Sequence, residues 1–128
     1  HLENVAASMA SAWARFNISR TEGLPRVVIE TQALGVPVVV SDSGPGREVA
    51  LTPPDTPLAQ ATGLRVPYAD PKALAAAIDT LRAMSDDERH AMGQRGSAHV
   101  RARYTLSGMT GKTLAVYREV TAHKPPRT

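Results

Sequence analysis

Two carboxylates that flank a short Gly-Leu-Pro segment are the residues of this 128-residue chain best suited to chemistry. Seven residues separate Glu22 from Glu30, and the segment between them begins with Gly23. Pro25 has the fixed φ angle that suits the first position of a helix. We therefore predict that Glu22 lies in a loop and that Glu30 lies about one and a half turns inside the following helix.

This arrangement suits a phosphorylated, hydroxyl-rich ligand. The backbone amides around Leu24, Arg26 and Val27 would form the positive end of the predicted helix, which is a favourable place for a diphosphate. Gly23 lets the backbone approach such a ligand closely. Glu30 can accept hydrogen bonds from both hydroxyls of a ribose, and Glu22 can do the same for a sugar. The pattern therefore favours a nucleotide-sugar.

Strand and helix patterns around these residues predict how they are positioned. A small helix at 5–12 precedes a short strand at 15–18, and the helix that begins at Pro25 should stop at Gly35, which can take a left-handed cap. The β-branched run over 36–41 does not alternate, so it predicts a strand buried on both faces. The order of elements predicts an α/β, Rossmann-like domain with a parallel sheet and flanking helices. Two or three strands make a small sheet, so we expect partner strands upstream of His1.

The second half of the chain adds a strand at 63–66 and three helices. Asp70 and Pro71 cap a helix with an apolar stripe, Ser85 and Glu88 form a capping box that opens a helix at about 86–103, and a last helix covers about 106–123. Lys124-Pro125-Pro126 should end that helix. Residues 42–46 have turn chemistry, with Asp42 as a turn-stabilising residue, and the Pro-rich segment 52–60 is expected to be an exposed loop.

Composition excludes several classes of site. The chain has no cysteine, which rules out disulfides, thiolate zinc sites and a cysteine nucleophile. The four histidines do not have the spacing of metal ligands, and we expect them at the surface. They are His1, His90, His99 and His123. The net charge is +3, and all of the positive excess lies in the second half, because the first half is net acidic. That half has neither interleaved aromatic residues nor a dense basic run, so we expect surface arginines rather than a nucleic-acid site. Trp13 is expected to pack rather than to stack on a base.

The sequence around the two glutamates resembles that of the retaining glycosyltransferases of family 4, which have the GT-B fold. The family pattern of Glu, seven residues and Glu is matched by Glu22 and Glu30. The flanking matches, which continue in the family's order along nearly the whole chain, are Gly23-Leu24-Pro25, Gln32-Ala33-Leu34-Gly35-Val36-Pro37-Val38-Val39, Asp42, Gly44, Arg47-Glu48-Val49, Thr62-Gly63-Leu64, Val66-Pro67, Asp70-Pro71, Met92-Gly93, Gly96 and Val116-Tyr117-Arg118.

The resemblance implies a single, N-terminally incomplete C-terminal, donor-binding domain over residues 1–128. It assigns Glu22 to the donor sugar near the reacting carbon, as the catalytic residue, and Glu30 to the ribose. The backbone from Gly23 to Val27, which includes Leu24, Pro25 and Arg26, would approach the sugar and the diphosphate. The resemblance also implies retention of configuration and no metal or other cofactor.

The same resemblance places an acceptor domain, a glycine-rich loop and a basic pair upstream of this region. The expected partners are therefore a nucleotide-diphospho-sugar and that missing domain. We expect a piece of a longer cytoplasmic chain, with peripheral membrane contact of the parent as a further option. Two alternatives stay open: a sugar-nucleotide epimerase of the same fold, and a non-enzymatic basic module that binds nucleic acid or anionic lipid.

Overall fold

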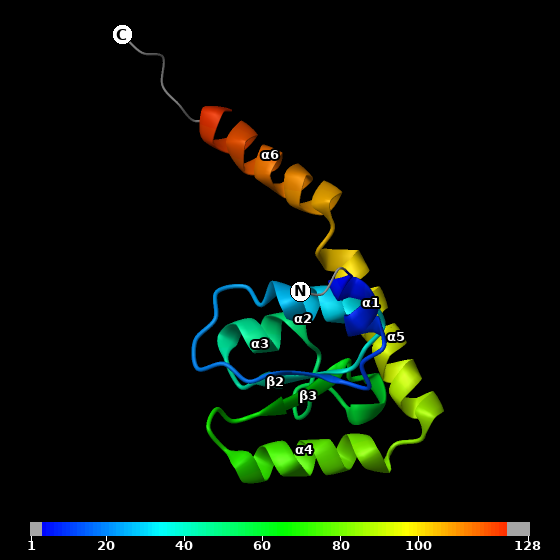
Figure 1. Cartoon of the computed structure of the whole chain (residues 1–128). Coiled ribbons are helices and arrows are strands. Elements are labelled where there is room, and N and C mark those ends of the chain that lie inside the picture. Colours follow the sequence, from blue (N-terminus) through cyan, green and yellow to red (C-terminus); the bar gives the residue numbers. More distant parts are fainter. Residues whose placement is uncertain (1–3, 123–128) are drawn as a thin grey trace.

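A three-stranded parallel sheet forms the centre of the computed structural model, which describes residues 4–122 (Figure 1). The strands are β1 (Arg15–Asn17), β2 (Val38–Ser41) and β3 (Gly63–Val66), in that order across the sheet. Phe16 pairs with Val39, which in turn pairs with Leu64. The three predicted strands and their parallel arrangement are confirmed. Among the described residues, β1 pairs with β2 alone, so its other side is an open edge.

Helices cover both faces of this sheet. Helices α2 (Arg26–Ala33) and α3 (Gly44–Val49) lie on one face, and α4 (Pro71–Ala83) lies on the other (Figure 1). Side chains alternate along β2, so that Val38 and Val40 pack toward Val28 while Val39 packs toward Leu81. Every residue of β2 is buried. The prediction of a strand covered on both faces is confirmed.

Most of the predicted helix ends are found where the sequence puts them. Gly35 has a φ of +76° and follows α2, as expected for a left-handed cap. Asp70 Oδ1 accepts a hydrogen bond from Ala73 N at 2.9 Å, and the capping box of α5 (Asp86–Arg103) is present in full. The α2 helix begins at Arg26, one residue later than predicted. Pro25 is therefore the N-cap residue and not the first residue of the helix.

Three predicted segments differ from the structure. Residues 42–46 do not form a turn, because Ser43 Oγ accepts from Gly46 N at 3.1 Å and thereby caps the short helix α3. The segment 52–60 is not wholly exposed: Thr52 is buried, and the segment ends in a 3₁₀ helix, η1 (Leu58–Gln60). The first helix, α1 (Val5–Ala10), is two residues shorter than predicted.

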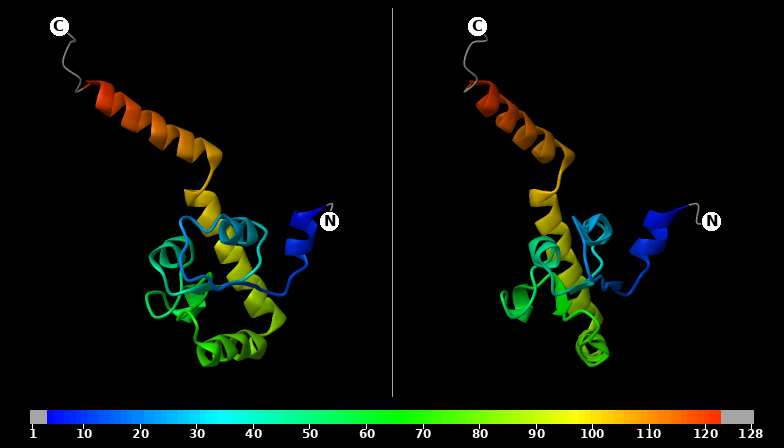
Figure 2. Two further views of the ribbon diagram at one scale, coloured as in Figure 1. Left: turned by 60° about the vertical axis from the view of Figure 1, so that its left-hand side comes forward. Right: turned by 90° about the vertical axis from the view of Figure 1, so that its left-hand side faces the viewer.

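The last helix, α6 (Leu106–Ala122), projects away from the sheet and its covering helices (Figure 2). None of its residues is buried, and Leu106 is 77% exposed. The predicted helix is therefore confirmed, while its predicted stop at Lys124-Pro125-Pro126 lies outside the described residues. Within residues 4–122, no helix has both the length and the hydropathy needed to cross a bilayer.

Candidate functional site

The β1–α2 loop, residues 18–25, leaves the sheet at the carboxyl ends of the strands. A serine on β2 anchors its start: Ser41 Oγ accepts from Ser19 N at 2.6 Å and donates to the Asn17 carbonyl at 3.3 Å. Open parallel sheets bind ligands outside this edge. The loop that carries Glu22 is thus fixed to the sheet at the place where an α/β domain normally positions a ligand.

Glu22 is half-buried and has one side-chain partner. Asn17 Nδ2 donates to Glu22 Oε1 at 3.4 Å, a long hydrogen bond that joins the end of β1 to the middle of the loop. Asn17 was not among the residues predicted for the site. Asn17 is a half-buried polar residue at the carboxyl end of the edge strand β1, and no motif in the sequence marks it as a site residue.

Glu30 lies on the exposed side of α2 next to Arg26. The Arg26 guanidinium and Glu30 Oε1 are 3.8 Å apart, and their side chains are 81% and 56% exposed. An exposed pair of this kind contributes little to stability. A ligand can therefore replace this ion pair at a small cost in free energy.

The amides at the start of α2 are only partly available, which corrects one prediction. The Arg26 amide is not free, because it donates to the Leu24 carbonyl at 2.8 Å. Within residues 4–122, the amides of Gly23, Leu24 and Val27 have no acceptor. A Cβ added at Gly23 would meet no other atom within 4 Å, so the space above that residue is open. The Val27 side chain, in contrast, packs against the core.

A groove of about 690 Å³ runs beside the first turns of α2. Its lining includes Leu24, Arg26 and Glu30 from the predicted site, but Glu22 is not among the lining residues. The opposite wall comes from the junction of α5 and α6 and includes Arg103 and Lys112 together with Tyr104 and Met109. These residues could not be predicted from the sequence, because they lie more than 70 positions beyond Glu30 and no local pattern connects them with it.

Asp42 follows β2 at the same edge of the sheet but already has partners. Its Oδ1 atom lies 2.8 Å from Arg47 Nε and 3.3 Å from Arg65 Nε. The hydrogen bond from Arg47 is the main reason why the pKa of Asp42 is lowered. Arg65 is only 7% exposed and also contacts Asp55 at 2.6 Å. Asp42 is therefore engaged by two arginines, while the turn that it was predicted to stabilise is replaced by the start of α3.

The described histidines do not form a site. His90 is exposed as predicted, but His99 is half-buried, and burial lowers its pKa. The expectation of a surface position is thus wrong for His99, whose ring lies edge-on to Tyr104. His1 and His123 lie outside the described residues. Among residues 4–122, no group of three or more histidines and carboxylates is arranged to hold a metal ion.

Comparisons with known proteins agree with this fold. Residues 1–84 match the family described as glycosyl transferases group 1. The structure of sucrose-phosphate synthase from Thermosynechococcus elongatus is 28% identical with a TM-score of 0.80, and the match covers 94% of this chain and 28% of that chain. A glycosyltransferase from Rickettsia africae shares the fold, with a TM-score of 0.72, at 23% identity, and the match covers 87% of this chain and 28% of that one. A comparison with curated proteins finds no match.

The family match extends over well more than half of the chain, and it includes both glutamates and all three strands. The layered α/β arrangement is that of a GT-B glycosyltransferase domain. The chain spans only 28% of the length of each of the two solved structures. It belongs to the group 1 glycosyltransferases.

Proposed function

We propose that this chain is the donor-binding part of a retaining glycosyltransferase that uses a nucleotide-diphospho-sugar. One observation carries the proposal: three amides without acceptors, those of Gly23, Leu24 and Val27, lie between two carboxylates at the carboxyl edge of the sheet. Amides at a helix start favour a diphosphate. Carboxylates on either side favour hydroxyl groups, so the two ends of the site fit a ribose and a sugar.

Glu30 binds the ribose in this proposal. Its carboxylate is exposed and its contact with Arg26 is long, so two hydroxyl donors can replace the guanidinium without a large desolvation cost. Arg26 is then free to turn toward the diphosphate. The groove beside Glu30 also carries Arg103 and Lys112, which add positive charge next to the same ligand.

Glu22 contacts the donor sugar near its reacting carbon. In the transfer step, the bond between that carbon and the diphosphate oxygen breaks, and a new bond forms to the acceptor oxygen on the same face of the sugar. The acceptor proton passes to the leaving phosphate. The free amides stabilise the charge that develops on the diphosphate, which is an electrostatic contribution to catalysis. The proposal gives no role to a metal ion or other cofactor.

A second domain completes the site in this proposal. The chain supplies one wall of the cleft, and the proteins it resembles are more than three times as long. Helix α6 presents Leu106, Met109, Val116, Tyr117 and Val120 on one side, and all five are exposed. We propose that this stripe packs against the acceptor domain of the parent.

Replacement of Glu30 tests the donor site. We expect Glu30→Gln in the full-length parent to weaken binding of UDP, GDP or ADP, whichever binds best, by roughly 10- to 100-fold. This estimate follows from the loss of charge-assisted hydrogen bonds worth about 1.5–3 kcal/mol. Isothermal titration calorimetry at fixed salt provides the measurement.

Glu48→Gln serves as the matched control, because Glu48 is an exposed helical glutamate on α3. Its nucleotide affinity should equal that of the parent. Equal affinities for the Glu30 and Glu48 variants would contradict the proposal. Binding of duplex DNA that falls steeply with salt and ignores Glu30→Gln would instead favour the basic binding module.

A further inference from the structure

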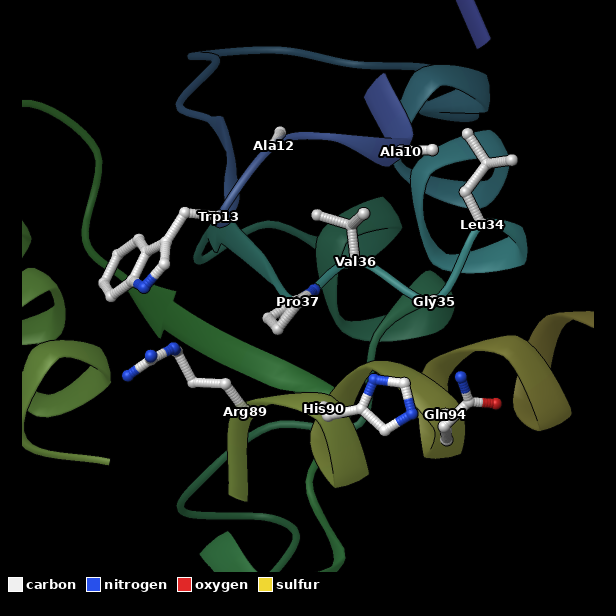
Figure 3. A pocket seen from close by; sticks show the side chains of 10 residues that line it. All are labelled: Ala10, Ala12, Trp13, Leu34, Gly35, Val36, Pro37, Arg89, His90 and Gln94. Carbon is white, nitrogen blue, oxygen red and sulfur yellow. The ribbon is translucent and has the colours of Figure 1, made fainter. Parts of the chain in front are cut away.

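A second hollow lies at the opposite edge of the sheet, where β1 and β2 begin (Figure 3). It has a volume of about 310 Å³. Its walls are the segment 10–13 before β1, the turn 34–37 between α2 and β2, and the first turns of α5. Parallel strands place their amino and carboxyl ends at opposite edges, so this hollow is separate from the loop that carries Glu22.

Trp13 forms one end of the hollow in a fixed position. Trp13 is 41% exposed, and the Arg89 guanidinium lies over its ring at 5.1 Å from the centroid. Arg89 is itself held by the Leu81 carbonyl at 3.2 Å, by the Met84 carbonyl and by Asp86. The Arg89 side chain is only 14% exposed. The aromatic ring is thus supported from one side before any ligand arrives.

Two polar side chains form the other end. His90 and Gln94 are four residues apart on α5 and therefore share one face of the helix, and Figure 3 shows their side chains next to each other. Both are exposed, and within residues 4–122 neither side chain has a hydrogen-bond partner. The Gln94 amide nitrogen lies against the turn at Gly35. The hollow therefore offers amide and imidazole groups that are not used by the fold.

We propose that this hollow, lined by Trp13, Arg89, His90 and Gln94, binds a neutral carbohydrate. The aromatic ring can take the apolar C–H face of a pyranose, while the amide and the imidazole can bind its hydroxyl groups. Arg89 is the one formally charged side chain among the ten residues that line the hollow, and its ion pair with Asp86 satisfies that charge. An anionic ligand would therefore gain little here. The volume lies at the lower end for small-molecule sites, which suits one sugar ring.

The inference is independent of the donor proposal. It assigns a binding site without a reaction, and it uses none of the residues between Glu22 and Glu30. A ligand at this edge can remain bound while the carboxyl edge is filled or empty. The two proposals can thus fail separately.

Trp13 is the only tryptophan of the chain, so its fluorescence reports directly on this hollow. We expect titration of the chain with methyl α-D-glucopyranoside, and with maltose, to give a saturable change in emission. Gln94→Ala should weaken the binding by about three- to tenfold, the value expected for the loss of a neutral hydrogen bond. Gln60→Ala, which removes an exposed glutamine from η1, should leave the affinity unchanged.

Three results would overturn the inference. The first is the absence of a saturable response to either saccharide while the circular dichroism spectrum shows the folded chain. The second is equal affinity of the Gln94→Ala and Gln60→Ala variants. The third is a response to inorganic phosphate in place of the neutral saccharides, which would make the hollow an anion site at Arg89.

Discussion

Asn17 shows how a single side chain connects the sheet with the proposed chemistry. It is the last residue of β1, and its amide contacts Glu22 across the loop at 3.4 Å. We expect Asn17→Ala in the full-length parent to lower kcat for sugar transfer by about three- to tenfold, because the carboxylate loses the donor that orients it. The KM for the donor should change less, since Glu30 and the free amides are untouched. A steady-state assay with varied donor concentration separates the two parameters.

An unchanged kcat in that assay would show that the contact between Asn17 and Glu22 does not matter for transfer. A loss of folded protein, seen by circular dichroism, would instead assign Asn17 to the fold. Asn17→Asp is a useful second variant because it keeps the size of the side chain but removes the amide donor. It should therefore reproduce the loss of kcat.

Glu88 gives a prediction about pH. The Ser85 amide donates to Glu88 Oε2 at 2.7 Å, and this bond lowers the pKa of Glu88 below its ordinary value of 4.5. A lowered pKa in the folded state means that the stabilisation is present above the ordinary pKa and is lost as the pH falls through the folded value. Glu88→Ala should therefore lower the urea midpoint at neutral pH and have a smaller effect at strongly acidic pH.

The matched control is Asp87→Ala, which removes a neighbouring carboxylate of the same helical turn without touching the capping box. Its effect on the urea midpoint should vary less with pH. If both variants showed the same pH dependence, the general attraction of carboxylates to the helix start would explain the result, and the hydrogen bond would not be needed.

At the residue scale, the sequence could place Glu22 in a loop and Glu30 on the following helix because these positions depend on local spacing around a helix start. It could not indicate Arg103 or Lys112, which reach the groove beside Glu30 from the far end of α5 and from α6. Nor could it show that the Arg26 amide is already bonded to Leu24, since that bond depends on the path of the loop. Positions set by local spacing could be predicted from the sequence, whereas contacts between distant segments could not.

At the scale of elements, α5 packs against the turn after α2 through a glycine. A Cβ at Gly93 would overlap the carbonyl oxygen of Gly35, which is backbone and cannot rotate away. We expect Gly93→Ala to destabilise the chain by about 3 kcal/mol, at the upper end for overpacking. Urea denaturation followed by circular dichroism is the measurement.

Gly111→Ala makes the comparison specific. Gly111 also lies inside a helix, but a Cβ there meets no other atom within 4 Å. Alanine is the better helix former by about 1 kcal/mol, so this variant should gain helical ellipticity without a loss of core stability. Equal destabilisation by the two changes would contradict a packing role for Gly93.

The elements whose signals are local were predictable from the sequence. Gly35, Asp70 and Ser85 cap their helices through hydrogen bonds within a few residues. The burial of β2 is predicted by its unbroken apolar run. Helix α3 was not predicted because serine and proline, here Ser43 and Pro45, are common both in turns and at helix starts. Its stability comes from Val49, which is fully buried between α2 and the sheet, and such burial is visible only in three dimensions.

At the scale of the whole molecule, the proposed site has one wall and an uncovered helix. Transfer requires donor and acceptor to be held together away from water, yet Glu30 is exposed and no residue of α6 is buried. We expect the 128-residue chain alone to bind nucleotide diphosphates weakly and to show no sugar transfer. If the proposed second domain covers the groove and the stripe on α6, the full-length parent should bind more tightly and turn over.

The measurement is a radiolabelled transfer assay with both proteins at equal concentration, and a calorimetric titration gives the two affinities. Leu106→Ser and Val120→Ser on α6 test whether a second domain covers the apolar stripe on this helix. In the parent they should reduce folding stability or turnover, since they would disturb a covered interface, whereas in the 128-residue chain they should leave the urea midpoint unchanged because both side chains are already exposed. Sugar transfer by the 128-residue chain would mean that the missing wall is not needed for the reaction.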